Sequence, residues 1–180
     1  MNYSVLMVDP PWPYEMGGTK KSRPTKYDKE WAYSTMSIAQ IGGLLASEIL
    51  PLMHSPHVLF MWALERSLLD AEAIGKSLGY KRHCRLIWDK RTGHAPAFTV
   101  QFAHEYLIWF YKSPMMKIDP AQRGKIRTVF QATPRQHSRK PDIAYAIVEA
   151  LYPGLKRLDV FSRENRPGWD SWGDEKGKFT

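Results

Sequence analysis

Two kinds of hydrophobic pattern alternate along this chain. Short runs of consecutive apolar residues indicate strands buried on both faces, whereas apolar residues at every third or fourth position indicate amphipathic helices. The short runs predict strands at residues 3–8, 57–62, 80–88, 106–111 and 158–161. The second pattern predicts helices at residues 37–53, 64–78 and 141–152, the first capped by Ser37. Residues 13–33 indicate a long loop, and Pro56 is expected to break the chain before the second strand.

This order of strands and helices predicts the fold class. Apolar strands separated by helices are typical of an α/β protein with a mostly parallel sheet and helices on both faces. Ligands of such proteins bind beyond the carboxyl ends of the strands. Polar residues come directly after three of the predicted strands, and these polar stretches begin at Asp9, just after Trp62, and at Ser162. We therefore expect a ligand site at that edge of the sheet.

Composition narrows the class of protein. The chain has 180 residues, of which 43% are hydrophobic, which fits a single globular domain. Its one cysteine, Cys84, excludes an internal disulfide framework and fits a reduced, intracellular setting. The first residues do not form a signal peptide, and no apolar run is long enough to cross a bilayer. The six histidines lack the spacing of metal ligands. We expect a cytoplasmic protein with no membrane partner and no metal.

The charge is positive and unevenly distributed. Lys and Arg outnumber Asp and Glu by 26 to 18, and the formal net charge of +8 favours a polyanionic partner. Residues 112–140 contain eight Lys or Arg and one acid, and residues 20–29 contain five Lys or Arg. Such concentrated cations suit contacts with phosphate, although a solvated surface explains them too.

The first predicted strand ends in the turn Asp9-Pro10-Pro11-Trp12. Its two prolines fix two φ angles and remove two backbone donors, so the turn presents a carboxylate, carbonyl acceptors and an aromatic face. These groups suit a flat ligand that donates hydrogen bonds, such as a nucleobase with an exocyclic amine. A structural proline turn with a capping aspartate is the alternative that these residues leave open.

The turn and seven later segments resemble, in order, the Asp-Pro-Pro-Trp family of adenine-N(6) methyltransferases. This family is typified by the catalytic subunit of the eukaryotic mRNA adenosine methyltransferase, and its bacterial and phage members modify DNA. The later segments are Tyr33–Ser37, Leu59–Trp62, Leu86–Lys90, His104–Leu107, His137–Asp142, Leu158–Arg163 and Pro167–Glu175. Each segment alone is weakly diagnostic, but the ordered set spans nearly the whole chain.

The resemblance implies a three-layer, Rossmann-like methyltransferase fold with a permuted motif order, in which the catalytic motif comes first and the cofactor motif last. It implies that residues 1–180 form a single domain without a separate target-recognition domain. It also implies S-adenosyl-L-methionine as the methyl donor. The permuted order explains why no Gly-x-Gly-x-x-Gly loop follows the first strand.

Residue roles carry over from the family to the matching positions. The resemblance assigns catalysis to Asp9, Pro10, Pro11 and Trp12, with Asp9 and the Pro10 carbonyl accepting the hydrogens of the 6-amino group. It assigns cofactor binding to Asp9, Lys140, Asp159, Arg163, Asn165, Asp174 and Glu175. Asp174 replaces the usual asparagine, so it accepts hydrogen bonds but cannot donate them. A strand-end ion pair is the alternative for Asp159, and Glu105 is expected only to support the site.

Substrate contacts are predicted for aromatic and basic residues. Trp12 and Tyr33 are candidates to hold the base by its face, although Tyr33 fits equally well as a packing residue at a helix start. Phosphate contacts are predicted for Lys20, Lys21, Arg23, Arg123, Lys125 and Arg127. A duplex substrate requires the adenine to be flipped out, because its amino group is otherwise paired and stacked.

These observations predict an adenine-specific, site-specific DNA methyltransferase of a phage or a bacterial host cell, with DNA as its partner and a homodimer left open. Two alternatives remain. An RNA adenine-N(6) methyltransferase is one, because basic loops suit either backbone. A non-catalytic nucleic-acid-binding subunit is the other, because the family contains inactive partners. The intact turn, together with Lys140 and Arg163, favours an active enzyme over that subunit.

Overall fold

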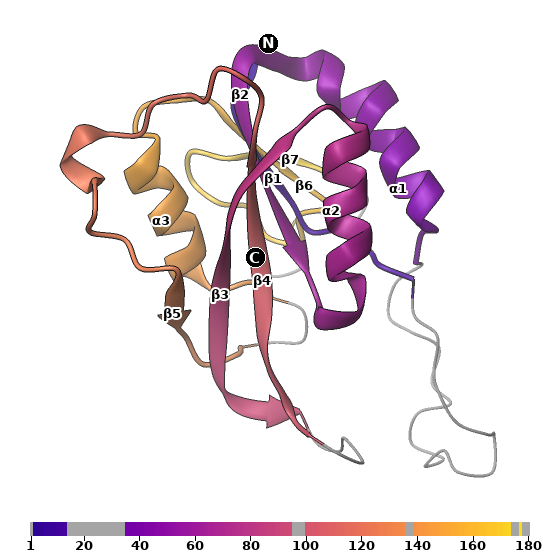
Figure 1. The fold of residues 1–180 in the computed structure, drawn as a ribbon, viewed down its shortest axis with the longest axis vertical. Coiled ribbons are helices and arrows are strands. Elements are labelled where there is room, and N and C mark those ends of the chain that lie inside the picture. The colour runs from indigo at the N-terminus through magenta and orange to yellow at the C-terminus, as the bar shows by residue number, and fades with distance from the viewer. Residues whose placement is uncertain (1, 14–34, 95–99, 136–138, 174–176, 178–180) are drawn as a thin grey trace.

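A computed structural model of the chain describes residues 2–13, 35–94, 100–135, 139–173 and 177. In these ranges seven strands form one sheet in the order β5-β3-β4-β2-β1-β6-β7 (Figure 1). The strands are β1 (Tyr3–Val8), β2 (Met53–Ala63), β3 (Lys81–His94), β4 (Phe102–Tyr111), β5 (Val129–Gln131), β6 (Arg157–Val160) and β7 (Asp170–Trp172). The α-helices are α1 (Ile38–Leu44), α2 (Leu68–Ser77) and α3 (Asp142–Leu151).

Most neighbouring strands are parallel, as the hydrophobic pattern predicted. β1 is parallel to β2 and to β6, β6 is parallel to β7, and β3 is parallel to β5. β4 is antiparallel to both of its neighbours, β2 and β3. The carboxyl ends of β1, β2 and β6 therefore lie at one edge of the sheet, together with the first residues of β4. The predicted α/β class with a mostly parallel, Rossmann-like sheet is confirmed.

Helices cover both faces of this sheet, α1 and α2 on one face and α3 on the other (Figure 1). Alternate residues of β1 belong to two different buried clusters, one on each face of the sheet. Leu6 and Val8 belong to the cluster under α1 and α2. Val5 and Met7 belong to the cluster under α3. Side chains of a strand point alternately to the two faces of the sheet. Asp9 follows Met7 by two residues, so its side chain lies on the α3 face with those of Val5 and Met7.

The helix predicted over residues 37–53 forms, but it changes geometry along its length. Ser37 caps it as predicted, since its hydroxyl accepts a hydrogen bond from the Gln40 amide. The Gln40 side chain accepts one in turn from the Ser37 amide, which completes a capping box. Beyond α1 the chain continues as a π-helical turn over Leu45–Ile49 and a 3-10 turn over Leu50–Leu52. The helix predicted at residues 64–78 likewise begins with a 3-10 turn, Glu65–Ser67.

The strands differ from the prediction at their ends and at the sheet edges. Pro56 does not break the chain but lies within β2, and the ladder to β4 begins only at Val58, so the missing amide hydrogen removes no bond there. β3 and β4 extend beyond their apolar runs because they pair as an antiparallel hairpin. β5 and β7 were not predicted, because each has only three residues and little buried surface.

Candidate active site

Two neighbouring pockets lie at the carboxyl edge of the sheet. The β1 pocket is lined by Asp9–Trp12, Leu64, Arg66, Glu105, Lys140 and Arg163. The β6 pocket is lined by Asp9, Arg139, Lys140, Tyr145, Asp159, Phe161–Glu164 and Arg166. The two pockets share three residues, Asp9, Lys140 and Arg163. These residues therefore lie where the pockets meet.

Backbone and indole hydrogen bonds hold the turn after β1 in place. The Asp9 amide donates to the Val160 carbonyl at 3.1 Å, and the Trp12 amide donates to the Pro10 carbonyl at 2.8 Å. The Trp12 indole N–H donates to the Trp62 carbonyl at 3.0 Å, and the Trp12 ring is buried. The Pro10 oxygen retains a second lone pair for another donor. The turn thus offers a carboxylate, a carbonyl and an aromatic wall to the β1 pocket.

Asp9 begins a row of four alternating charges. Lys140 Nζ lies 3.1 Å from Asp9 Oδ1 and 2.9 Å from Glu105 Oε2. Lys90 Nζ lies 2.6 Å from the other Glu105 oxygen, Oε1. Lys140 also lies over the Trp62 ring, 5.1 Å from its centroid. The row is mostly buried, and its pairing meets the requirement that buried charges have partners of opposite sign.

Burial and neighbouring charges compete in setting the pKa values of this row. Burial would lower the pKa of Lys140, but the carboxylates of Asp9 and Glu105 outweigh it and raise that pKa. Burial would raise the pKa of Glu105, but the ammonium groups of Lys140 and Lys90 lower it instead. For Asp9 burial prevails, so its pKa is raised despite Lys140. Asp9 is therefore the carboxylate of the row that takes up a proton more readily.

Asp159 brings a second acid to the α3 face of the sheet. Its side chain is buried, and the Tyr145 hydroxyl donates to its Oδ2 at 2.9 Å. Burial raises the pKa of Asp159 to about 7, although the hydrogen bond from Tyr145 acts to lower it. Its Oδ1 is buried too and has no hydrogen-bond partner among the described residues. An acceptor of this kind in a pocket lining is available to a donor of a bound ligand.

The chain turns sharply after β6. Phe161 has φ of +61°, a left-handed conformation that costs a bulky residue on the order of 1–2 kcal/mol. Its amide donates to the carbonyl of Trp172, the last residue of β7, at 2.7 Å. Gly173, with φ of +134°, lies against the Phe161 backbone, and a Cβ there would approach Phe161 Cα to 3.2 Å. This turn brings the residues after Phe161 into the lining of the β6 pocket.

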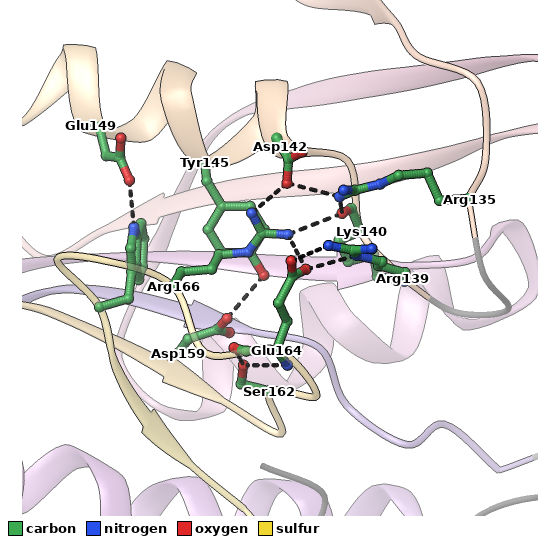
Figure 2. A network of polar contacts seen from close by, with 11 residues as sticks. Arg135, Arg139, Lys140, Asp142, Tyr145, Glu149, Asp159, Ser162, Glu164 and Arg166 are labelled. Atoms are coloured by element: carbon green, nitrogen blue, oxygen red, sulfur yellow. Dashed lines mark hydrogen bonds and ion pairs between the residues drawn. The ribbon is translucent and has the colours of Figure 1, made fainter. Parts of the chain in front are cut away.

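Arginines and acids form a network around the first turn of α3 (Figure 2). Arg166 pairs with Asp142 and lies 2.6 Å from Glu164 Oε2. Arg139 pairs with the same Glu164, and Arg135 lies 2.7 Å from Asp142. The network connects the segment before α3, the start of α3 and the segment after β6. It therefore fixes the two segments that border the β6 pocket relative to each other.

Seven of the residues predicted from the sequence are brought together in the two pockets: Asp9, Pro10, Pro11, Trp12, Lys140, Asp159 and Arg163. Asn165 is exposed and is not part of either lining, although its neighbours Glu164 and Arg166 are. The predictions for Lys20, Lys21, Arg23, Tyr33, Asp174 and Glu175 fall outside the described residues.

Of the basic residues predicted to contact phosphate, the three that the structure describes, Arg123, Lys125 and Arg127, do not line the two pockets. The Asp119 amide donates to the Leu151 carbonyl at 2.9 Å, at the carboxyl end of α3. A ten-residue helix is about 15 Å long, so this end lies about that far from the first turn of α3. Arg123 follows the 3-10 turn next to Asp119, at the end remote from the pockets. Lys125 comes next, and Arg127 precedes β5 at the sheet edge.

Sequence reasoning gave some residues of this site a minor role or none. Glu105 was expected only as support, and its signal is a charge that interrupts an otherwise apolar strand. Lys90, Tyr145, Glu164 and Arg166 were not singled out, because their partners lie far away in the sequence or on another element.

In the described ranges, no group of three or more His, Cys, Asp or Glu residues could hold a metal ion. In the same ranges, no helix is long and apolar enough to cross a membrane.

The mostly parallel sheet, with an Asp-Pro-Pro-Trp turn at its carboxyl edge, places this chain in the class of Rossmann-like methyltransferases. The MT-A70 family model matches residues 3–175, and the chain belongs to this family. The family resemblance seen in the sequence is thereby confirmed.

Relatives of two kinds are similar to this chain. Type II methyltransferase M.MunI from Mycoplasma sp is 27% identical over 193 residues, covering 96% of this chain and 77% of that protein. An N(6)-adenosine-methyltransferase MT-A70-like protein from Drosophila melanogaster is 27% identical over 186 residues. Human METTL3, named an N(6)-adenosine-methyltransferase catalytic subunit, is 25% identical over 183 residues. The chain covers 27% and 28% of these two proteins, so it spans about a quarter of their length.

Proposed function

We propose that this chain is an S-adenosyl-L-methionine-dependent methyltransferase that methylates the 6-amino group of adenine in DNA. The observation that carries the proposal is the meeting of two pockets at Asp9, Lys140 and Arg163. A transfer reaction needs two ligands in contact, and such an arrangement suits a base in the β1 pocket and a donor in the β6 pocket. Membership of the MT-A70 family, with relatives named N(6)-adenosine-methyltransferases, supports adenine as the base.

The lining of the β6 pocket fits the proposed cofactor. S-adenosyl-L-methionine, when bound, supplies a methyl group already activated by its sulfonium. The buried Oδ1 of Asp159, which has no partner among the described residues, suits a hydroxyl or amine of the ligand, and the ammonium of Lys140 suits a carboxylate. Arg163 adds a cation shared by both pockets. The cofactor roles of Asn165, Asp174 and Glu175 are carried forward as predictions from the family resemblance alone.

The groups of the β1 pocket account for activation of the amine. The Asp9 carboxylate and the Pro10 carbonyl accept its two hydrogens, which favours a more tetrahedral nitrogen with an available lone pair. Lys140, 3.1 Å from Asp9, favours the ionised carboxylate before reaction. The raised pKa of Asp9 then suits it to hold the proton that the nitrogen loses. Trp12, fixed through its indole N–H, provides a flat wall for the base.

DNA is proposed as the substrate from the similarity to M.MunI, a Type II methyltransferase that is 27% identical over 96% of this chain, and from the basic segments of the sequence. Phosphate contacts are proposed for Arg123, Lys125 and Arg127, and for Lys20, Lys21 and Arg23, which lie outside the described residues. Since Arg123 lies near the far end of α3, we expect it to contact backbone distant from the target base.

Asp9→Asn tests the proposal. Wild-type protein, labelled S-adenosyl-L-methionine and matched adenine-containing DNA and RNA should give methyl transfer, more to DNA. The variant should lose at least about 100-fold in rate, the usual contribution of a positioned acid or base, while retaining most of its donor affinity. Asp70→Asn, on α2 and outside both pockets, is the matched control and should retain wild-type activity.

Three outcomes would contradict parts of the proposal. Wild-type protein that binds the donor but methylates neither nucleic acid would support the non-catalytic subunit instead. Preferred methylation of RNA would replace DNA as the substrate. Full activity of Asp9→Asn would remove Asp9 from the catalytic turn.

A further inference from the structure

The guanidinium of Arg166 occupies the centre of the network at the start of α3 (Figure 2). Its Nη1 donates to Asp142 Oδ1, and its Nη2 donates to Glu164 Oε2 at 2.6 Å. The same Nη2 lies 3.3 Å from the backbone carbonyl of Lys140. The guanidinium thus fixes the main chain of the residue whose ammonium lies between Asp9 and Glu105.

Arg166 also contacts the residue that holds Asp159. Its guanidinium carbon lies 3.9 Å from the centroid of the Tyr145 ring, and Trp169 packs edge-on against that ring at 5.2 Å. The ring is therefore confined by two neighbours, and its hydroxyl donates to Asp159 Oδ2 at 2.9 Å. One side chain thus acts on both Lys140, through its carbonyl, and Asp159, through Tyr145.

We propose that Arg166 is a positioning residue that sets Lys140 and Asp159, a cation and an acid that both line the β6 pocket, at a fixed separation for the methyl donor. The inference rests on the proposed function, which assigns these two residues to the cofactor. Lysine cannot replace this arginine, because the planar guanidinium both stacks on the Tyr145 ring and directs several N–H groups to Asp142, Glu164 and a carbonyl at once.

The charge of Arg166 has a second, measurable effect on Asp159. The groups that face this carboxyl are the Tyr145 hydroxyl of α3, the Ser162 hydroxyl beyond β6, the Asp9 carboxylate beyond β1, and Arg166. Burial raises the pKa of Asp159 to about 7, and Arg166 acts to lower it. Loss of Arg166 therefore raises this pKa further. Binding of S-adenosyl-L-methionine through the ionised carboxylate of Asp159 should then require a higher pH.

The test measures the affinity of the whole chain for S-adenosyl-L-methionine by calorimetry between pH 6 and 9. Arg166→Lys and Arg166→Met should bind at least about tenfold more weakly, the equivalent of one lost hydrogen bond to a charged group. Their affinity for S-adenosyl-L-methionine should also rise with pH, and the midpoint of this rise should lie at a higher pH than in wild-type protein. Arg166→Met should show the larger shift of midpoint, because Arg166→Lys retains the charge.

Arg135→Met is the matched control. Arg135 donates to the same Lys140 carbonyl and to Asp142, but the cation over the Tyr145 ring is that of Arg166. It is more exposed than Arg166, and its loss should weaken donor binding only about twofold without moving the midpoint. Tyr145→Phe leaves the ring under Arg166 and removes only the hydroxyl, so it should move the midpoint to higher pH if the arginine variants do not fold.

Each outcome has a distinct meaning. Lower thermal stability without weaker binding or a shifted midpoint would give Arg166 a structural role only and overturn the inference. Equal effects of the Arg135 and Arg166 variants would overturn it as well. Wild-type protein that binds no donor would overturn the proposed function and this inference with it, whereas normal wild-type binding confines any failure to Arg166.

Discussion

Glu105→Gln should destabilise this protein more than Lys90→Met, and adding Lys90→Met to Glu105→Gln should restore part of the lost stability. The Glu105 carboxylate lies 2.6 Å from Lys90 Nζ and 2.9 Å from Lys140 Nζ. Without it, Lys140 still has Asp9 at 3.1 Å. Lys90 has no second carboxylate within ion-pair distance among the described residues, and its side chain is only 7% exposed. Glu105→Gln therefore leaves one buried ammonium group without a counter-charge.

The magnitudes follow from which charges keep a partner. Removing one member of a buried pair costs about 3–5 kcal/mol when the other is left uncompensated, and this applies to Glu105→Gln. Lys90→Met should cost about 1–2 kcal/mol, because Glu105 keeps its bond to Lys140. The double variant should also cost about 1–2 kcal/mol, since no unpaired ammonium group remains. For a chain of this length, Glu105→Gln should lower Tm by roughly 10 °C.

Urea unfolding followed by tryptophan fluorescence measures these free energies, and Glu72→Gln provides the matched control. Glu72 also pairs with two cations, Arg82 at 2.9 Å and Arg85 at 2.7 Å, but all three side chains are at least 24% exposed. Its loss should cost less than about 1 kcal/mol. The reasoning is refuted if Glu105→Gln costs no more than this control. It is refuted also if Lys90→Met is equally destabilising with and without Glu105.

Two further predictions concern packing and pH. Gly75→Ala should destabilise the protein by about 1–3 kcal/mol, because a Cβ at this position would lie 2.5 Å from the Phe110 ring. Thermal unfolding measures this effect, and an unchanged Tm would contradict the packing of α2 on β4. Asp159 has a folded-state pKa of about 7, above its ordinary value of 3.8, so its contribution to stability is fully present below pH 4 and is lost as the pH rises through 7. Asp159→Asn should therefore gain stability relative to wild type between pH 5 and pH 8 in urea unfolding, and a constant difference would disprove the raised pKa.

Sequence patterns predicted the parts of the fold that depend on local hydrophobicity. β1 was predicted at its observed bounds, and α3 within one residue at each end, because both have continuous or regularly spaced apolar residues. β5 and β7 depend instead on pairing with distant strands, and their few residues carry no detectable pattern. The change from α to π geometry at Leu45 likewise has no signal in a run of good helix-forming residues.

The candidate site also has residues that local sequence predicts and residues that it does not. Asp9 could be predicted because it lies in a proline turn at the end of a strand, and Lys140 and Asp159 because they lie in short segments that resemble the family. The partners that hold them could not, because pairing across the fold is not encoded in local spacing. Lys140 and Glu105 are 35 positions apart, and Arg166 and Asp142 are 24. A single sequence gives the chemistry of such residues but not their contacts.

The position of Glu105 shows why the strand-end rule was insufficient. The rule that ligands bind beyond the carboxyl ends of parallel strands points to the residues that follow a strand, such as Asp9 after β1. β4 is antiparallel, and Ala63 at the end of β2 pairs with Tyr106. The first residues of β4 therefore lie at the same edge, and Glu105 shares the face of Leu107, under α3. An antiparallel strand within a parallel sheet thus adds to the ligand edge the residues that begin it, and here these supply the carboxylate that joins Lys90 to Lys140.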